Sequence, residues 1–218
     1  LEPDLRRAMQ EMASTLPSTA LPRRREEILK WLRLKNPDLA FQEAHDLGIL
    51  KHISPILDAA LNEPGTEDFY SYLRQIPRAE TLGPGELFGL LVLAFTRAFL
   101  QTEPDPHVRD LLGGEKMQYW MREELGMFKF EQALTVKALH VEPLLAKRKD
   151  FQRKGERRQN ALLANEAFPL AMIFARTDYF LGGEDLQYWS ERFTQLREQH
   201  PEAINRGGAG GGAAARRR

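Results

Sequence analysis

The sequence contains no cysteine among its 218 residues. This absence excludes a disulfide scaffold, cysteine-based catalysis and thiolate metal sites, and it suits a reducing compartment such as the cytoplasm. Long apolar runs are also missing, because the longest, LFGLLVLAF at 87–95, is far below the roughly 18–20 residues that span a bilayer. The opening residues, LEPDLRRAMQEM, lack the apolar middle and the cleavage site of a signal peptide. We therefore expect a cytoplasmic protein with no membrane partner.

The motifs of common catalytic sites are absent as well. The sequence has no G-x-x-x-x-G-K-[ST] phosphate loop, no G-x-S-x-G elbow and no H-E-x-x-H zinc motif. The glycines of GPGELFG at 83–89 do not form a phosphate loop, because Pro84 removes a backbone N–H; this segment indicates the start of a helix. We expect no catalytic residue, metal site or cofactor in this chain.

One doublet keeps a hydrolase open as an alternative. His45 and Asp46 match the centre of one class of metal-dependent phosphohydrolases, whose sites need further His and Asp ligands from other helices. His52, His107 and His140 are present, but none lies in a supporting motif. The competing interpretation is that His45 and Asp46 are ordinary residues in the last turn of a helix.

Helical patterns dominate the chain and predict an all-α fold. Apolar residues recur at steps of three and four, and no segment keeps the alternation of a strand. In NPDLAFQEAHDLG, for example, Asn36 can cap a helix, Pro37 suits its first position and Gly48 suits its end. We expect an irregular array of about ten helices, over 3–16, 22–34, 37–47, 50–61 with a break at Pro55, from Thr66 onward, 84–100, 106–125, 128–149, 155–164, 166–181 and 183–199. The 84–100 helix is expected to be the most buried.

Charge is segregated although the whole chain is neutral. Residues 147–158 carry a net charge of +5 and residues 206–218 carry +4, so the remainder carries −9. A run of charge on a helix is usually a solvated face, but this segregation favours a partner that bears phosphates. The tail, RGGAGGGAAARRR, is too poor in apolar residues to fold, and we expect residues 200–218 to be disordered.

The cations of residues 147–158 gather around Gly155, where a helix is expected to begin. A helix N-terminus and several arginines together suit phosphate binding. The predicted RNA contacts are first Arg153, Lys154, Arg157 and Arg158, and then Lys147, Arg148 and Lys149. The segment RRREE at 23–27 opens an expected helix in a similar way.

Aromatic residues have two interpretations. Trp31, Trp120, Tyr188 and Trp189 lie on expected helices. Packing in the core is the more common role for such side chains. The alternative is a platform on which unpaired bases stack.

The first part of the chain resembles the neck region of bacterial poly(A) polymerases and CCA-adding tRNA nucleotidyltransferases. That region combines an R-x-x-E-E-x-x-K-x-L helix with an A-x-x-x-x-x-x-L-G-[IL]-L segment that leads to a proline. Their counterparts here are Arg23–Leu32, Ala40–Leu50 and Pro55.

The later part resembles the body of the poly(A) polymerase branch. There a basic element precedes a helix, which is followed by an H-P-x-[FY]-R-A-A-Y-D-[FL] segment and a Trp-containing helix. The counterparts are residues 153–158, 168–180 and 186–193. The sequence departs from the pattern at three positions: Asn165 and Glu166 replace the His-Pro pair, and Ser190 replaces a second tryptophan.

The resemblance implies a division of the chain and of its chemistry. Residues 1–62 would be a neck-like region, residues 63–199 a helical body that binds RNA, and residues 200–218 the tail. The family's catalytic head carries a G-[SG]-x-x-R-D element and a D-x-D pair that binds Mg²⁺ beside ATP, and this sequence contains neither element. The expected function is therefore the non-catalytic RNA-binding portion of an enzyme that extends RNA 3′ ends, with single-stranded RNA or a 3′ end and the missing head as partners. The alternative from another class is a helical protein-interaction scaffold.

Overall fold

The computed structural model describes residues 2–13, 15, 20–76, 82–100 and 114–199, and every regular element in these ranges is a helix. The predicted all-α class is confirmed. Among the described helices, none is both long and apolar enough to cross a bilayer. Residues 200–218, which we expect to be disordered, His107 and residues 106–113 of the helix expected over 106–125 lie outside the described residues.

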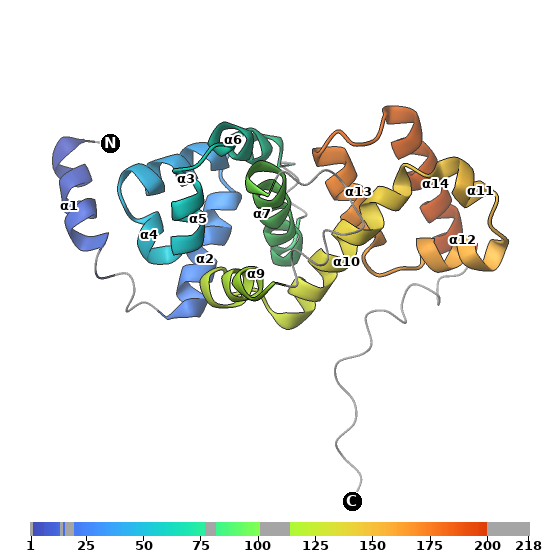
Figure 1. The fold of residues 1–218 in the computed structure, drawn as a ribbon, viewed down its shortest axis with the longest axis horizontal. Coiled ribbons are helices and arrows are strands. Elements are labelled where there is room, and N and C mark those ends of the chain that lie inside the picture. Colours follow the sequence, from blue (N-terminus) through green and yellow to red (C-terminus); the bar gives the residue numbers. More distant parts are fainter. Residues whose placement is uncertain (1, 14, 16–19, 77–81, 101–113, 200–218) are drawn as a thin grey trace, which may run out of the picture.

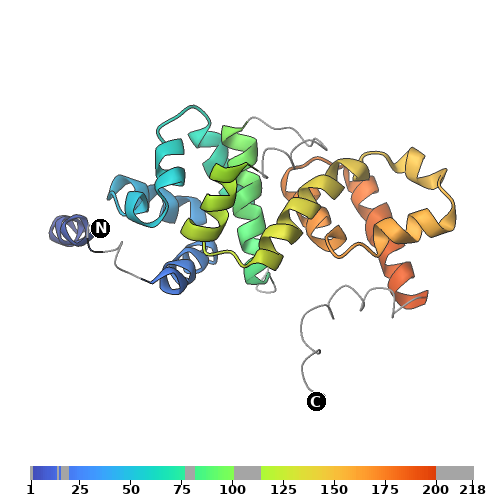
Figure 2. The same ribbon diagram turned by 60° about the horizontal axis from the view of Figure 1, so that its bottom comes forward.

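The helices form two lobes joined by one long helix (Figures 1 and 2). The first lobe contains α1 (Pro3–Ala13), α2 (Leu21–Leu32), α3 (Pro37–Asp46), α4 (Leu50–Ile53), α5 (Pro55–Ala60), α6 (Thr66–Gln75), α7 (Pro84–Phe99) and α9 (Glu115–Tyr119), which continues as the π-helical turn η2 (Trp120–Glu124). The second lobe contains α11 (Arg148–Gln152), α12 (Glu156–Leu163), α13 (Phe168–Thr177) and α14 (Gly183–Gln199). Helix α10 (Lys129–Leu145) runs from one lobe to the other and packs against both α7 and α13.

Two expectations about helix ends need correction. Asn36 occupies the N-cap position of α3 and Pro37 begins the helix, but the Asn36 side chain makes no capping hydrogen bond. The helix expected over 128–149 ends at Leu145, two residues after Pro143, and α11 begins as a separate helix at Arg148. The first basic residues thus lie on a short helix of their own instead of extending α10.

The core is one continuous cluster that extends from α2 to α14. Helix α7 lies at its centre, as predicted, with an unbroken run of buried residues from Leu87 to Thr96. Trp120 and Trp189 are completely buried, and the ring of Trp120 packs 4.4 Å from that of Phe95. The base-stacking alternative is therefore wrong for both tryptophans, because their faces are already covered by core side chains.

A buried ion pair joins the two halves of the sequence. The Arg25 guanidinium donates to both carboxylate oxygens of Glu131, at 2.9 and 2.6 Å, and to the carbonyl oxygen of Gly126 at 2.9 Å. It also lies between the rings of Phe88 and Phe128, 4.6 Å from each centroid. Arg25 belongs to the RRREE segment that was compared with a phosphate-binding helix start, and this arginine faces the core instead of solvent.

A second buried cluster connects α7, α10 and the end of α13. Arg97 donates to Glu142 and to Asp178, each at 2.7 Å, and Tyr72 donates to Asp178 at 2.6 Å. Two carboxyls thus share this arginine. Burial raises the pKa of Glu142 to about 8, against the opposing attraction of Arg97 and with the Asp178 carboxylate adding to the shift.

Arg25→Ala is expected to lower the free energy of unfolding by about 3–5 kcal/mol, because it leaves the Glu131 carboxylate buried without its partner. Urea unfolding measures this loss. Arg23→Ala, an exposed neighbour on the same helix, is the matched control and should change stability by no more than about 0.5 kcal/mol. Equal effects of the two substitutions would contradict the structural role of Arg25.

Glu142→Gln is expected to flatten the pH dependence of stability between pH 6 and pH 8. The pKa of Glu142 is higher in the folded chain, at about 8, than its ordinary value of 4.5, so the folded state holds an extra proton. That contribution is complete below pH 4.5 and is lost as the pH rises through 8, by up to about 1.4 kcal/mol per pH unit. Urea unfolding of both proteins at the two pH values tests this; parallel pH profiles would refute it.

Candidate nucleic-acid interface

The basic segment, residues 147–158, is built on a buried aromatic contact. Phe151 on α11 packs edge-to-face on Trp189 of α14, with ring centroids 4.6 Å apart. The indole N–H of Trp189 donates to the carbonyl oxygen of Leu145 at 2.9 Å. These contacts hold the end of α10 and the whole of α11 against α14. The cations of the basic segment therefore lie on helices that are packed against the core.

A glutamine holds the turn between α11 and α12. The Gln159 side chain donates from Nε2 to the carbonyl oxygens of Lys154, at 2.7 Å, and Gln152, at 3.3 Å. Its Oε1 accepts a bond from Arg192 of α14 at 3.1 Å. Sequence reasoning missed Gln159, because nothing in a one-dimensional pattern marks a glutamine that bonds backwards to the preceding turn.

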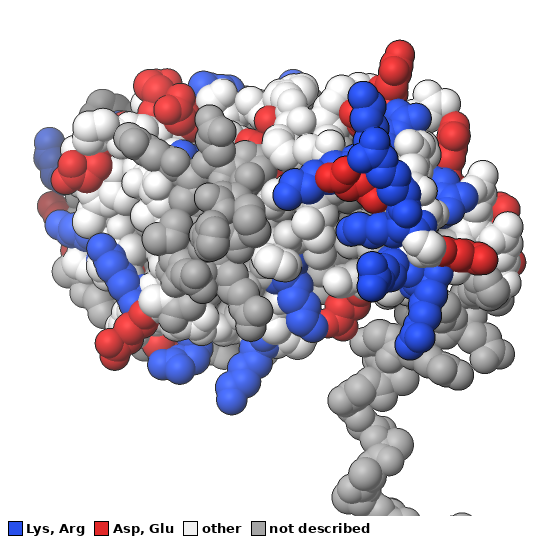
Figure 3. Space-filling model, turned by 45° about the vertical axis from the view of Figure 1, so that its right-hand side comes forward, with Lys and Arg blue, Asp and Glu red and all other residues white. Residues whose placement is uncertain are grey.

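Six of the seven predicted cations are exposed to solvent: Lys147, Lys149, Arg153, Lys154, Arg157 and Arg158. Lys and Arg side chains gather on the lobe that carries α11 and α12 (Figure 3). Among these six, Arg153 pairs with Asp150 at 3.8 Å, and the two side chains are 81% and 65% exposed. Such a pair contributes little and leaves Arg153 available for a phosphate.

The seventh cation, Arg148, is held by the protein itself. Its guanidinium bonds Asp185 at 3.0 Å and lies 4.1 Å above the ring of Tyr188. Both partners belong to α14, so Arg148 fastens α11 to that helix. Tyr188 carries this arginine on one face, which limits the predicted stacking of a base there.

The N-terminus of α12 lies within the basic segment, as predicted. Gly155 is the N-cap residue, and Glu156, Arg157 and Arg158 form the first turn. Gly155 has an ordinary backbone conformation with φ of −63°, and an added Cβ would meet nothing within 4 Å. The backbone is therefore open to solvent at the point where the cations converge.

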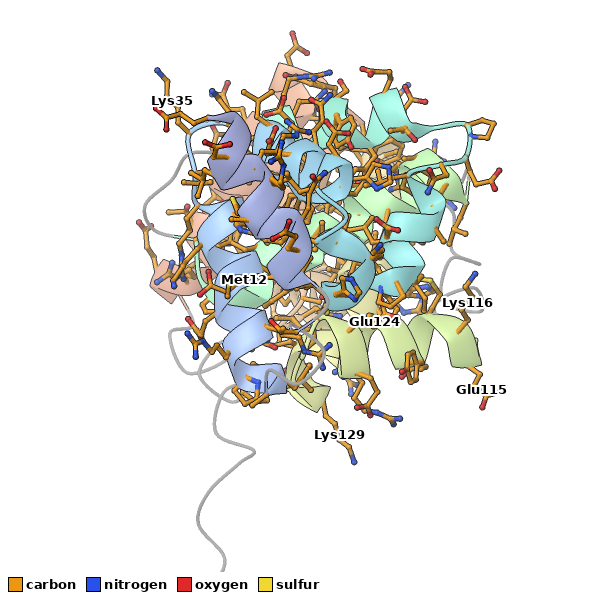
Figure 4. The ribbon with its side chains drawn as sticks, turned by 90° about the vertical axis from the view of Figure 1, so that its left-hand side faces the viewer. Met12, Lys35, Glu115, Lys116, Glu124 and Lys129 are labelled. Carbon is orange, nitrogen blue, oxygen red and sulfur yellow. The ribbon has the colours of Figure 1, made fainter. Side chains whose placement is uncertain are left out.

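Residues 1–61 have a different electrostatic character. They contain nine Lys or Arg and nine Asp or Glu, a net charge of zero. Lys35, on the turn between α2 and α3, extends away from the molecule (Figure 4).

The Nδ1 atom of His45 lies 2.8 Å from Oδ1 of Asp58, which links α3 to α5. No group of three or more potential metal ligands occurs among the described residues.

Glu124 ties this first region to η2. Its Oε2 accepts hydrogen bonds from the Ser54 hydroxyl at 2.8 Å and from the Ile56 backbone at 3.1 Å. Trp120 in turn donates to the Ser54 oxygen at 2.9 Å. Glu124 thus lies between helices, unlike Lys116 and Lys129, which project outward (Figure 4). Burial raises the pKa of Glu124 and outweighs these hydrogen bonds.

The N-terminal part of the chain matches a model of a known family. Residues 1–61 match the family model described as "Probable RNA and SrmB- binding site of polymerase A". No curated protein and no solved structure matches the chain. The match supports the poly(A) polymerase resemblance at a coarse level and supports RNA as a partner.

Gln159→Ala is expected to loosen the turn at residues 152–155 and to lower the free energy of unfolding by about 1 kcal/mol, since the backbone carbonyls lose their donor. Limited trypsin digestion should cut faster after Arg153 and Lys154. Gln187→Ala is the matched control, because Gln187 is exposed on α14 and bonds Glu191 on the same helix. Equal cleavage rates in the two variants would show that Gln159 does not hold the turn.

Proposed function

We propose that this chain is the RNA-binding portion of a poly(A) polymerase-like nucleotidyltransferase that extends RNA 3′ ends. The observation that carries the proposal is the match of residues 1–61 to the RNA-binding family model of polymerase A. The exposed cations of residues 147–158 add a second line of support, because they lie beside a helix N-terminus in a segment whose net charge is +5.

In this proposal the two regions do different work. Lys and Arg side chains of the basic segment neutralise phosphates of a single strand, a contact that holds RNA regardless of base sequence. Such binding suits an enzyme that must release its product end and bind it again after each addition. Residues 1–61 have a net charge of zero, so they would contact the RNA through polar groups and complementary shape more than through net charge.

Catalysis belongs elsewhere in the proposal. The residues that hold Mg²⁺ and ATP would lie on a catalytic head outside residues 1–218, and the chain alone would be inactive. The poly(A) branch is favoured over CCA addition by the segments at 153–158 and 168–180 that resemble its body. A cytoplasmic location stays a prediction from the absence of cysteine.

Replacing Arg157 and Arg158 together by Glu is expected to weaken binding of single-stranded RNA uniformly across sequences, because both side chains contact phosphates in this proposal. The slope of log affinity against log salt should flatten by roughly 0.7 for each lost contact. Filter binding at several salt concentrations measures both quantities.

The double substitution of Arg157 and Arg158 by Lys is the matched control. It keeps both charges, so the salt slope should remain that of the original protein. If the Glu variant also keeps the original slope, these residues are not part of the RNA path. A chain that binds no RNA at any salt concentration would instead favour the interaction scaffold.

A further inference from the structure

A groove of about 550 Å³ lies along α10. It is bounded by η2 on one side and by the link between α12 and α13 on the other, and α10 contributes the stripe from Lys129 to Val141. The volume falls within the range of roughly 300–1,000 Å³ that holds small ligands. The groove lies outside residues 1–61 and outside residues 147–158.

The lining of the groove combines the groups that bind a nucleotide. Ala133, Val136 and Val141 supply an apolar wall against which the face of a base can pack. Amide side chains at the wall can bond the edge of a base, and Gln132, for example, is buried and oriented by its bond to the Met127 carbonyl oxygen at 2.7 Å. The lining has no acidic member, whereas Arg122, Lys129 and Lys137 contribute three positive charges.

These cations can exchange their partners for a phosphate. Arg122 bonds Glu123 and Lys137 bonds Glu166, but all four side chains are more than 40% exposed. Exposed pairs of this kind are weak, in contrast to the Arg25–Glu131 pair, whose side chains are 8% and 3% exposed. Lys129 has no ion pair among the described residues and extends outward (Figure 4).

An exposed aromatic pair stands at the Lys129 end of the groove. Phe128 and Phe130 flank Lys129 in the sequence, and their rings are nearly parallel, with 14° between planes and 6.0 Å between centroids. Phe130 is 67% exposed. One face of Phe128 is covered by Arg25, so Phe130 is the better surface for an unpaired base.

One wall of the groove lies near the C-terminal end of α12. This wall includes Asn165, two residues after the end of that helix, and the basic turn lies at the other end of the eight-residue helix, about 12 Å away. A strand that leaves the cations at Arg157 and Arg158 can therefore continue along α12 into the groove.

We propose that this groove binds one or two unpaired nucleotides of the RNA strand, with one base against Val136, a neighbouring base on Phe130 just outside the lining, and phosphates at Lys129 and Arg122. The inference rests on the proposed RNA-binding function and adds a second, separate contact site to it. The basic segment gives affinity through charge, whereas the groove holds bases out of a helix and so selects single-stranded RNA.

The test uses the full chain with a single-stranded oligoadenylate, a duplex RNA of equal length and AMP. Methyl NMR signals of Ala133 and Val136 should shift on addition of the single strand and of AMP, and much less with the duplex. Phe130→Ala should weaken oligoadenylate binding about tenfold, and Lys129→Ala should weaken it severalfold.

Lys116→Ala is the matched control, because Lys116 is an exposed lysine on the neighbouring α9 that does not line the groove. It should bind as the original protein does. Oligoadenylate that binds without moving the Ala133 and Val136 signals would overturn the groove while leaving the proposed function intact. Shifts with AMP but not with RNA would overturn the assignment to a strand. A chain that binds none of the three ligands would overturn both proposals.

Discussion

The buried pair between Arg25 and Glu131 determines how the two lobes are connected. These residues are separated by 106 positions, and their side chains meet where α2, α7 and the start of α10 converge. Glu131 also accepts the Phe128 backbone N–H at 2.8 Å, so the same carboxylate caps α10 and binds Arg25. A buried ion pair adds little net stability relative to an apolar pair of the same shape, but it penalises every packing that separates its members. This contact therefore favours the arrangement in which the start of α10 lies against α2 and α7.

The same distinction between buried and exposed charge sorts the arginines by role. Arg25 and Arg97 each serve buried carboxylates and cannot leave them without exposing an unpaired charge in the core. Arg148 is intermediate, because it is shared between Asp185 and the Tyr188 ring. The side chains of Arg153, Arg157 and Arg158 are exposed to solvent. Charge in the sequence therefore overstates the cationic surface, and burial decides which side chains remain for a ligand.

Much of the fold could be predicted from the sequence. The three- and four-residue apolar spacing gave the helices, and the run at 87–95 identified the helix at the centre of the core. Local patterns contain Pro143, two residues before the end of α10, but they do not show that Trp189 bonds the Leu145 carbonyl from 44 residues away at this break between α10 and α11. Local patterns also do not show which arginine of RRREE faces the core, because Arg25 is held there by Glu131 on a helix that is distant in the sequence. The candidate site shows the same limit. The cations are evident in the sequence, but the hydrogen bonds of Gln159 and the groove along α10 form only when the chain folds.

The basic segment offers mainly charge, whereas the α10 groove adds apolar and amide groups to its own three cations, and this difference has a physical consequence for binding a flexible strand. A purely cationic surface holds any polyanion and loses affinity steeply with salt, because binding releases counterions. Base stacking and contacts to base edges depend less on salt and require the strand to be unpaired. On this chain the basic turn and the groove lie toward opposite ends of α12, and α10 packs against both α7 and α13. The distance between them is therefore set by the buried core, and a strand that spans both must adopt the extension that this core dictates.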